Sequence, residues 1–251
     1  MDQDGFAYRF DWGPSGLRSL APVVDVLVIV DVLRFTTAVS VAVDRGSTVF
    51  PYRFADSTAG EYAAERDALL AGRRGDGSWS LSPTELLSLP EGARLVLPSP
   101  NGSALAFAAR RHGAAHVLAG CLRNASATAR RARALATLGS GVIGVTAAGE
   151  RWRHDIGPVR HAVEDLLGAG AVLAALDPSG SVSAPRCSPE AAAARAAFLD
   201  ARSLLAESLL ECATGRELAE RGCADDVEEA AVLDVSSTAA LLVGDAFVAA
   251  G

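Results

Sequence analysis

The stretch "VVDVLVIVDVLRFTT", Val23 to Thr37, decides the fold class. Its central part, 26–31, is an apolar run of strand length that is rich in β-branched residues and is followed by polar ones. A strand covered by helices on both faces has this composition, whereas a half-exposed strand alternates polar and apolar residues. The run therefore predicts a buried strand, followed by a helix over 36–46 that stops at Gly46.

The rest of the chain continues this alternation of strand and helix. Further strands are expected at 47–52, 93–102 (where the strand runs into a turn), 115–120, 141–149 and, as a closing pair, within 230–248. Helices are expected at 57–72, 103–113, 124–139, 158–176 and 189–215, the last as one helix or two, continued by 216–222. The alternation indicates one α/β domain over 1–251, with three layers, α/β/α, around a mostly parallel sheet that can include antiparallel strands.

Polar residues follow the expected strands at the points where the strands end. Asp31, Arg34, Thr36 and Thr37 follow the first strand, and later exits carry Asn101-Gly102-Ser103, Arg123-Asn124 and Glu150. Ligands of open α/β sheets bind outside the carboxyl ends of the strands, where the N–H groups of helix starts attract anions. A carboxylate there suits Mg²⁺, and arginine and N–H groups suit phosphate oxygens. These residue types indicate a site for a phosphate group and a metal ion.

Composition excludes several classes of protein. The net charge of −7 argues against binding to nucleic acid or to an anionic membrane surface. All 23 basic residues are arginine, so a Walker-type phosphate loop, which needs lysine, is excluded. The four cysteines lack the spacing of a zinc site. The N-terminus does not resemble a signal peptide, and no apolar run is long enough to span a bilayer, so we expect a soluble cytoplasmic protein.

Five ordered motifs resemble those of the 2-phosphosulfolactate phosphatase family. "DVLRFTT" (31–37) is similar to the family's Asp-Val-Leu-Arg-Ala-Thr-Thr signature, and "PSPNGSAL" (98–105) to its Thr-Thr-Asn-Gly-Thr element. The later motifs are "GCLRNAS" (120–126), "VEDLLGAGAV" (163–172) and "GCADDVEEA" (222–230), the last with Asp226 at a matching position. Together they run in family order over almost the whole chain.

The resemblance implies an α/β enzyme that uses Mg²⁺ to hydrolyse the phosphate monoester of a small acid, with a homodimer left open as its assembly. It implies catalytic roles for Asp31, Arg34, Asn101, Asn124 and Glu164. It implies phosphate binding by Arg34, Thr36, Thr37, Gly102 and Ser103, and metal binding by Asp31, Glu164 and Asp165.

Taken alone, the same residues allow plainer roles. Asp31 and Asn124 can cap the helices that follow them. Asn101-Gly102 is a common turn dipeptide. Glu164 and Asp165 lie within an expected helix, where acids are usually solvated.

Other catalytic chemistries do not fit. Enzymes that form an aspartyl phosphate need a second aspartate two residues after the first, and Leu33 stands there. A cysteine phosphatase needs an arginine six residues after the cysteine, which no cysteine of this chain has. His112 and His116 are separated by a helix end, so they are not expected to share a metal.

Two departures from the family pattern bear on function. In "WSLSP" (79–83), Leu81 stands where the family has asparagine, and Arg73 replaces an acid further upstream. The alternatives are a phosphatase for a different, more anionic phosphorylated acid and a divergent relative that binds a small anion without catalysis. The direction in which Leu81 points, into the cleft or away from it, helps to discriminate them.

Overall fold

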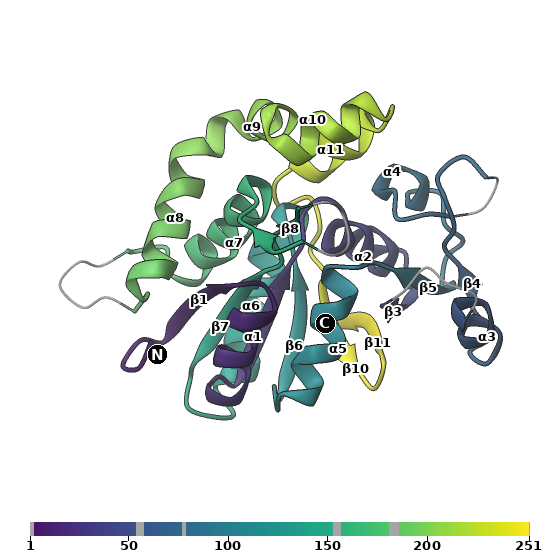
Figure 1. Cartoon of the computed structure of the whole chain (residues 1–251). Helices are drawn as coiled ribbons and strands as arrows, with labels where there is room; N and C mark the ends of the chain where they lie inside the picture. The colour runs from purple at the N-terminus through teal and green to yellow at the C-terminus, as the bar shows by residue number, and fades with distance from the viewer. Residues whose placement is uncertain (1–2, 54–57, 77–78, 153–156, 181–185, 251) are drawn as a thin grey trace.

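A large mixed sheet forms the middle of the three layers in the computed structural model, which describes residues 3–53, 58–76, 79–152, 157–180 and 186–250 (Figure 1). Along the sheet, its strands are β1 (Tyr8–Trp12), β7 (Ile143–Ala147), β2 (Val26–Val30), β6 (His116–Gly120), β10 (Ala239–Val243), β11 (Ala246–Ala250), β3 (Thr48–Tyr52), β5 (Arg94–Pro98) and β4 (Leu69–Leu70).

The sheet has two parallel sets of strands joined by a hairpin. β1, β7, β2 and β6 are parallel to one another, as are β3, β5 and β4. The C-terminal hairpin β10–β11 lies between them. Its strand β10 is antiparallel to β6, and its strand β11 is antiparallel to β3. The predicted three-layer α/β fold is confirmed, and the sheet is mixed.

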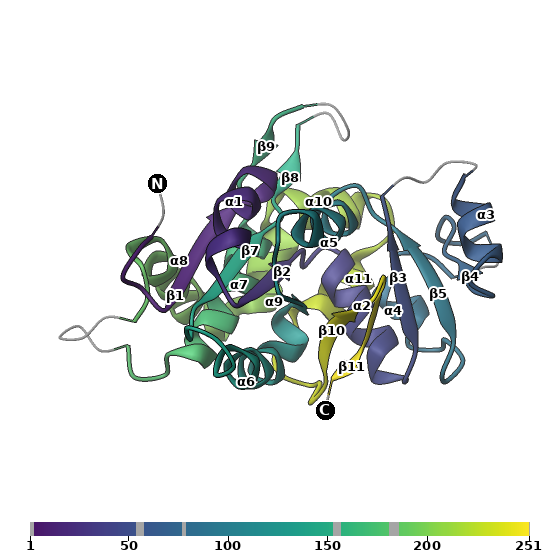
Figure 2. The same ribbon diagram turned by 90° about the horizontal axis from the view of Figure 1, so that it is seen from below.

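Strand β2 shows why this stretch decides the fold. Successive side chains of a strand point to opposite faces. Val26, Val28 and Val30 pack into one apolar cluster with the helices of one layer, α6 (Ala125–Ala136), α7 (Val163–Leu176) and α8 (Pro189–Ala201). Leu27 and Ile29 pack into another with α1 (Gly13–Leu20), α2 (Phe35–Asp44) and α5 (Gly102–Arg111). Figure 2 shows α1 and α5 on the side of the sheet opposite α6. Every residue of β2 is buried, which is why its sequence is continuously apolar.

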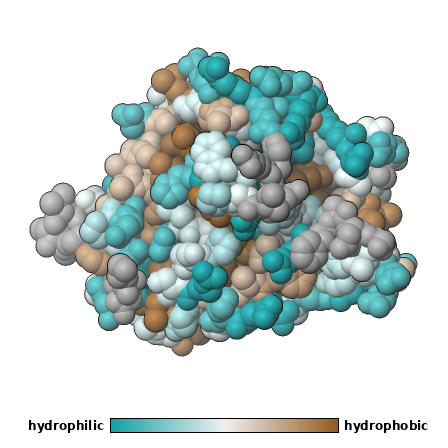
Figure 3. All heavy atoms as spheres, in the orientation of Figure 1, coloured by the Kyte–Doolittle hydropathy of each residue, from teal (hydrophilic) through white to brown (hydrophobic). Residues whose placement is uncertain are grey.

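A helical arm lies above the strand ends. It consists of α9 (Leu205–Glu211), α10 (Ala213–Glu220) and α11 (Ala224–Ala231), with α4 (Pro83–Leu86) beside α11 (Figure 1). Hydrophilic side chains gather over α10 and α11 on the outer face (Figure 3). The arm therefore has one solvated side and one side toward the sheet.

Several expected boundaries were wrong. The helix expected over 57–72 is α3 (Thr58–Ala64), because Leu69–Leu70 instead form β4 and extend the sheet beside β5. The helix expected over 158–176 begins only at Val163, because Val159–Arg160 form β9 and pair with β8 (Glu150–Arg151). The edge strand β1 and the helix α1 were not predicted.

The long C-terminal helical region is broken twice. A 3₁₀ turn at Arg202–Leu204 separates α8 from α9. Cys212 then has extended backbone angles, and its sulfur accepts a hydrogen bond from the Gly215 N–H, so it caps α10. These breaks bend the region across the strand ends. None of the helices within the described ranges is both long and apolar enough to cross a membrane.

Candidate active site

A cleft of about 270 Å³ opens where β2, β5 and β7 end, beneath α10. Its walls come from five separate parts of the chain. The lining residues are Asp31, Leu33, Arg34, Leu81, Ser99, Pro100, Asn101, Glu150, Thr214, Glu217, Leu218 and Arg221. Three of the residues singled out from the sequence, Asp31, Arg34 and Asn101, therefore meet in one cavity.

Asp31 is a buried carboxylate held by backbone groups. One oxygen accepts from the Phe35 N–H at 3.2 Å and the other from the Gly102 N–H at 2.8 Å. Burial, and then the negative charge of Glu150, raise the pKa of Asp31 to about 7, against the opposing effect of these two N–H groups. A nearby cation would stabilise the ionised form of a carboxyl group in this environment.

Gly102 allows the β5 exit to reach Asp31. A Cβ at this position would lie 2.2 Å from the Phe35 ring and 2.7 Å from the Asp31 carboxylate. No side chain fits there, so only glycine brings its N–H onto the acid. Nearby, the Asn101 side-chain amide donates to Glu150 at 3.0 Å, which fixes a second acid of the cleft.

Asp165 lies behind the cleft, at the start of α7. Its carboxylate accepts from the Val32 N–H at 2.7 Å and the Gly149 N–H at 2.8 Å, tying α7 to two strand exits. Burial, together with the charges of Asp31 and Glu164, raises the pKa of Asp165 well above its ordinary value. Two coupled acids with raised pKa values thus lie at the end of β2.

Glu164 is also buried, and it accepts a hydrogen bond from the Cys212 thiol at 3.3 Å. Burial and the negative charge of Glu164 raise the pKa of Cys212 to about 12, so this thiol stays protonated. Neither Glu164 nor Asp165 is among the described residues that line the cleft.

The side chains of four other residues singled out from the sequence form hydrogen bonds with the local backbone. Thr36 donates to the Asp31 carbonyl, Thr37 to the Val32 carbonyl and Ser103 to the Leu97 carbonyl. Asn124 accepts from the Cys121 N–H and donates to the Ala119 carbonyl. All four are buried. These bonds shape the strand exits and give each side chain a structural reason for its type, while their predicted contacts with phosphate and substrate remain predictions.

The acids of the site do not form a closed metal cage. Within the described ranges, no group of three or more His, Cys, Asp or Glu side chains is arranged to hold a metal ion. Mg²⁺ usually keeps several waters and takes one or two protein carboxylates. Asp31 and Glu150, which both line the cleft and interact electrostatically, fit that simpler arrangement.

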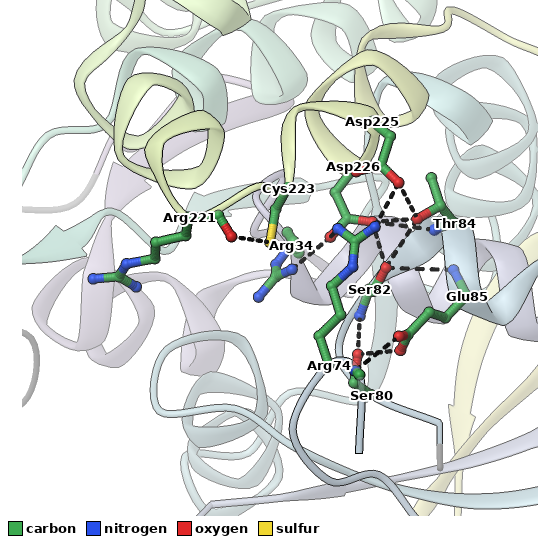
Figure 4. Close-up of polar contacts among 11 residues, drawn as sticks. Arg34, Arg74, Ser80, Ser82, Thr84, Glu85, Arg221, Cys223, Asp225 and Asp226 are labelled. Carbon is green, nitrogen blue, oxygen red and sulfur yellow. Dashed lines mark hydrogen bonds and ion pairs between the residues drawn. The ribbon is translucent and has the colours of Figure 1, made fainter. Parts of the chain in front are cut away.

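Arg34 points from the end of β2 toward a second buried acid, Asp226, in α11 (Figure 4). The guanidinium donates to the Asp226 carboxylate at 2.5 Å, and Arg74 donates to the same oxygen at 3.1 Å. The other oxygen accepts from the hydroxyls of Ser82 and Thr84. We call these five residues the Asp226 cluster. It joins the helical arm, the segment before α4 and the β2 exit.

The α10 wall of the cleft could not be found from the sequence. Thr214, Glu217 and Arg221 line the cleft, and Arg221 pairs with Glu217 four residues before it. In the sequence, such a pair indicates only a solvated helix face. The preceding turn at Cys212, which directs α10 over the strand ends, carries no strong local signal.

Leu81 lines the cleft and packs partly on the apolar cluster around α2 and α5. The departure from the family pattern at this position therefore lies at the site itself and adds an apolar patch to the cleft wall. Arg73, the other departure, is exposed and is not among the described residues that line the cleft.

Comparisons with known proteins show the family to which the chain belongs. The family model described as 2-phosphosulpholactate phosphatase matches residues 16–244. A 2-phosphosulfolactate phosphatase of Methanothermobacter thermautotrophicus is 31% identical over 205 residues, 80% of this chain and 79% of its own. A probable 2-phosphosulfolactate phosphatase of Thermus thermophilus is 33% identical over 217 residues, 83% of this chain and 86% of its own. The chain belongs to the 2-phosphosulfolactate phosphatase family.

Proposed function

We propose that this protein is a Mg²⁺-dependent phosphatase that hydrolyses the phosphate monoester of a small acid related to 2-phosphosulfolactate. The observation that carries the proposal is the pair Asp31 and Arg34 at the end of one buried strand, both facing the same cleft. Within the described parts of the chain, Asp31 forms no ion pair, and Arg34 lines the same cleft. The names of the two relatives support the reaction class.

Asp31 and Glu150 are the residues that would hold the metal ion, with Glu164 and Asp165 adding negative charge behind them. The ion would supply charge neutralisation at the phosphoryl oxygens. Arg34 would bind the same oxygens through the N–H groups that it does not use on Asp226. Asn101 orients Glu150 through its amide hydrogen bond, which leaves that carboxylate placed to hold and orient the attacking water.

Phosphoryl transfer depends mostly on positioning and on stabilising charge, and the contacts proposed for these residues are of that kind. Removing a preorganised donor from a developing anion costs on the order of 10²-fold or more in rate. The buried acid and the arginine are both fixed by bonds to the backbone or to Asp226 before any substrate arrives. The site is therefore preorganised.

The test is phosphate release from a panel of small phosphorylated acids, including phosphosulfolactate and phospholactate, with Mg²⁺ and with EDTA. We expect release with Mg²⁺ and none with EDTA. Asp31→Asn should lose most of this release, and the matched control Asp177→Asn, which changes another buried acid that does not line the cleft, should keep it. Metal-independent release would contradict the role of Mg²⁺ but leave a phosphatase.

A second candidate function is favoured by one observation. Leu81 faces the cleft at the position where the family resemblance places asparagine, so the cleft has lost a polar group. A relative that binds a small anion without catalysis would show no phosphate release from any substrate in the panel. Titration calorimetry with inorganic phosphate would then still show binding that Arg34→Ala removes.

A further inference from the structure

A second cavity, of about 930 Å³, lies beside the cleft and is larger than it. Ser99 and Pro100, at the exit of β5, line both cavities and form the boundary between them. The rest of its wall comes mainly from α1, α5 and the start of β8. A ligand that enters the cleft therefore has a second space next to it.

The ionisable residues that line this second cavity are all basic: Arg18, Arg53, Arg111, His112 and Arg151. We call this cavity the arginine pocket. Within the described ranges, no Asp or Glu side chain lines it. The whole chain carries a net charge of −7, so this concentration of positive charge is not a consequence of the overall composition.

Several other arginines of this chain pair with acids, as Arg34 and Arg74 do with Asp226. In the arginine pocket, Arg18 instead donates to the Ser15 hydroxyl at 3.1 Å, and Arg151 to the Gly157 carbonyl at 3.1 Å. Neither of them, nor Arg111, forms an ion pair with any acid among the described residues. Their charge is uncompensated by these residues.

The cleft has the opposite balance. Asp31, Glu150 and Glu217 line it, against two arginines that already have acidic partners. A second anionic group of a substrate would be repelled by these acids if it stayed in the cleft. The arginine pocket is the adjoining space with the complementary charge, and guanidinium groups suit phosphate, carboxylate and sulfonate oxygens.

We propose that the arginine pocket binds a second anionic group of the substrate, so that the substrate extends past Ser99 and Pro100. This proposal rests on the proposed function of the cleft. The substrate class is a phosphate monoester with a second anionic group at the far end of a chain. Phe107, an exposed aromatic residue of α5, gives the connecting chain an apolar wall.

The experiment compares alkanediol monophosphates with the corresponding bisphosphates, for chains of two to six carbons. The two members of each pair differ only in the second anionic group. We expect the bisphosphate to have a KM lower by about tenfold or more at the best chain length. The double variant Arg18→Ala/Arg111→Ala should lose this ratio. Both side chains are exposed, so the variant should fold.

The matched control is Arg130→Ala/Arg202→Ala, which removes two exposed arginines from a groove among α6, α7 and α8, in the other helical layer. It should keep the full preference for the bisphosphate. Equal KM values for the two members of every pair in the wild type, or a preference that survives in Arg18→Ala/Arg111→Ala, would overturn the arginine pocket while leaving the phosphatase intact.

If the wild type releases phosphate from none of these esters or from the acid panel, the proposed function fails. Titration calorimetry with the bisphosphates then tests the arginine pocket separately. Binding that weakens about tenfold in Arg18→Ala/Arg111→Ala, and not in the control, would support the pocket. Absence of binding to the wild type would overturn it.

Discussion

Asp31 and Asp226 are both buried carboxylates, but their surroundings differ. Asp226 receives two arginines and two hydroxyls, so its charge is neutralised within the fold (Figure 4). Asp31 receives two backbone N–H groups, but its burial, followed by the negative charge of Glu150, raises its pKa to about 7.

The contrast between Asp226 and Asp31 distinguishes an acid with a structural role from an acid with a proposed role in function. Burying a charge is costly unless it is paired, so removing one partner from a paired acid such as Asp226 destabilises the fold around it. An acid that remains unpaired costs stability, and a binding site for a cation gives a physical reason for its retention. This contrast favours a positioning role of Asp226 toward Arg34 and supports our proposal that Asp31 is the acid that binds the ligand.

The largest effect is expected at the unpaired acid. Asp31→Asn removes the charge with little change in shape, so turnover should fall on the order of 10³-fold, because charge stabilisation dominates phosphoryl transfer. Phosphate release under saturating Mg²⁺ measures this. The melting temperature at pH 8 reports whether the variant still folds, because asparagine can accept only one of the two backbone N–H bonds that Asp31 accepts. Turnover within tenfold of the wild type would assign the reaction to another acid.

A large loss of stability is expected at the paired acid. Asp226→Ala leaves Arg34 and Arg74 without their shared partner and should lower the free energy of unfolding by about 3 kcal/mol. Urea denaturation measures the loss. The neighbouring Asp225→Ala, at a side chain that is 50% exposed, should cost less than about 1 kcal/mol. Equal losses of unfolding free energy at the two positions would contradict the proposed contribution of the buried Asp226 ion pairs to stability.

A smaller effect is expected from pH. The pKa values of Asp31 and Asp165 are higher in the folded chain than in the unfolded one, so the folded chain binds more protons. The free energy of unfolding, measured in EDTA, should therefore fall as pH rises from about 4 to about 8. Asp31→Asn should make this dependence shallower. Mg²⁺ should raise the melting temperature more at pH 8 than at pH 5, because it binds the charged form.

The smallest effect is expected within the Asp226 cluster. Ser82→Ala removes one of several donors to Asp226 and also the side-chain cap of α4, which accepts from the Glu85 N–H, so it should cost about 1–2 kcal/mol of unfolding free energy. Ser88→Ala, at an exposed hydroxyl that bonds only to the Glu85 carbonyl, should change it by less than about 0.5 kcal/mol. Urea denaturation compares the two. A loss at Ser82 as large as that of Asp226→Ala would contradict the leading role given to the two arginines in the cluster.

Part of the candidate site followed from the sequence alone. A continuous apolar strand fixes the position of its own exit, so the placement of Asp31 and Arg34 at a strand end was predictable. Where residues far apart had to be combined, local patterns did not suffice. The local sequence predicts a helix at Leu69–Leu70, but these residues pair with β5. It also predicts a helix at Val159–Arg160, but these residues pair with β8.

By itself, the sequence determined the fold class, the buried strand β2 and the polar types at its exit, because hydrophobic periodicity and turn residues are local properties. Only the tertiary structure decided three things. The C-terminal hairpin β10–β11 lies in the middle of the sheet, and α10 lies over the cleft. Asp226 contacts Arg34, which is 192 residues away along the chain. The physical reason is that packing and the neutralisation of buried charge act between segments, and a local pattern cannot show which segments meet.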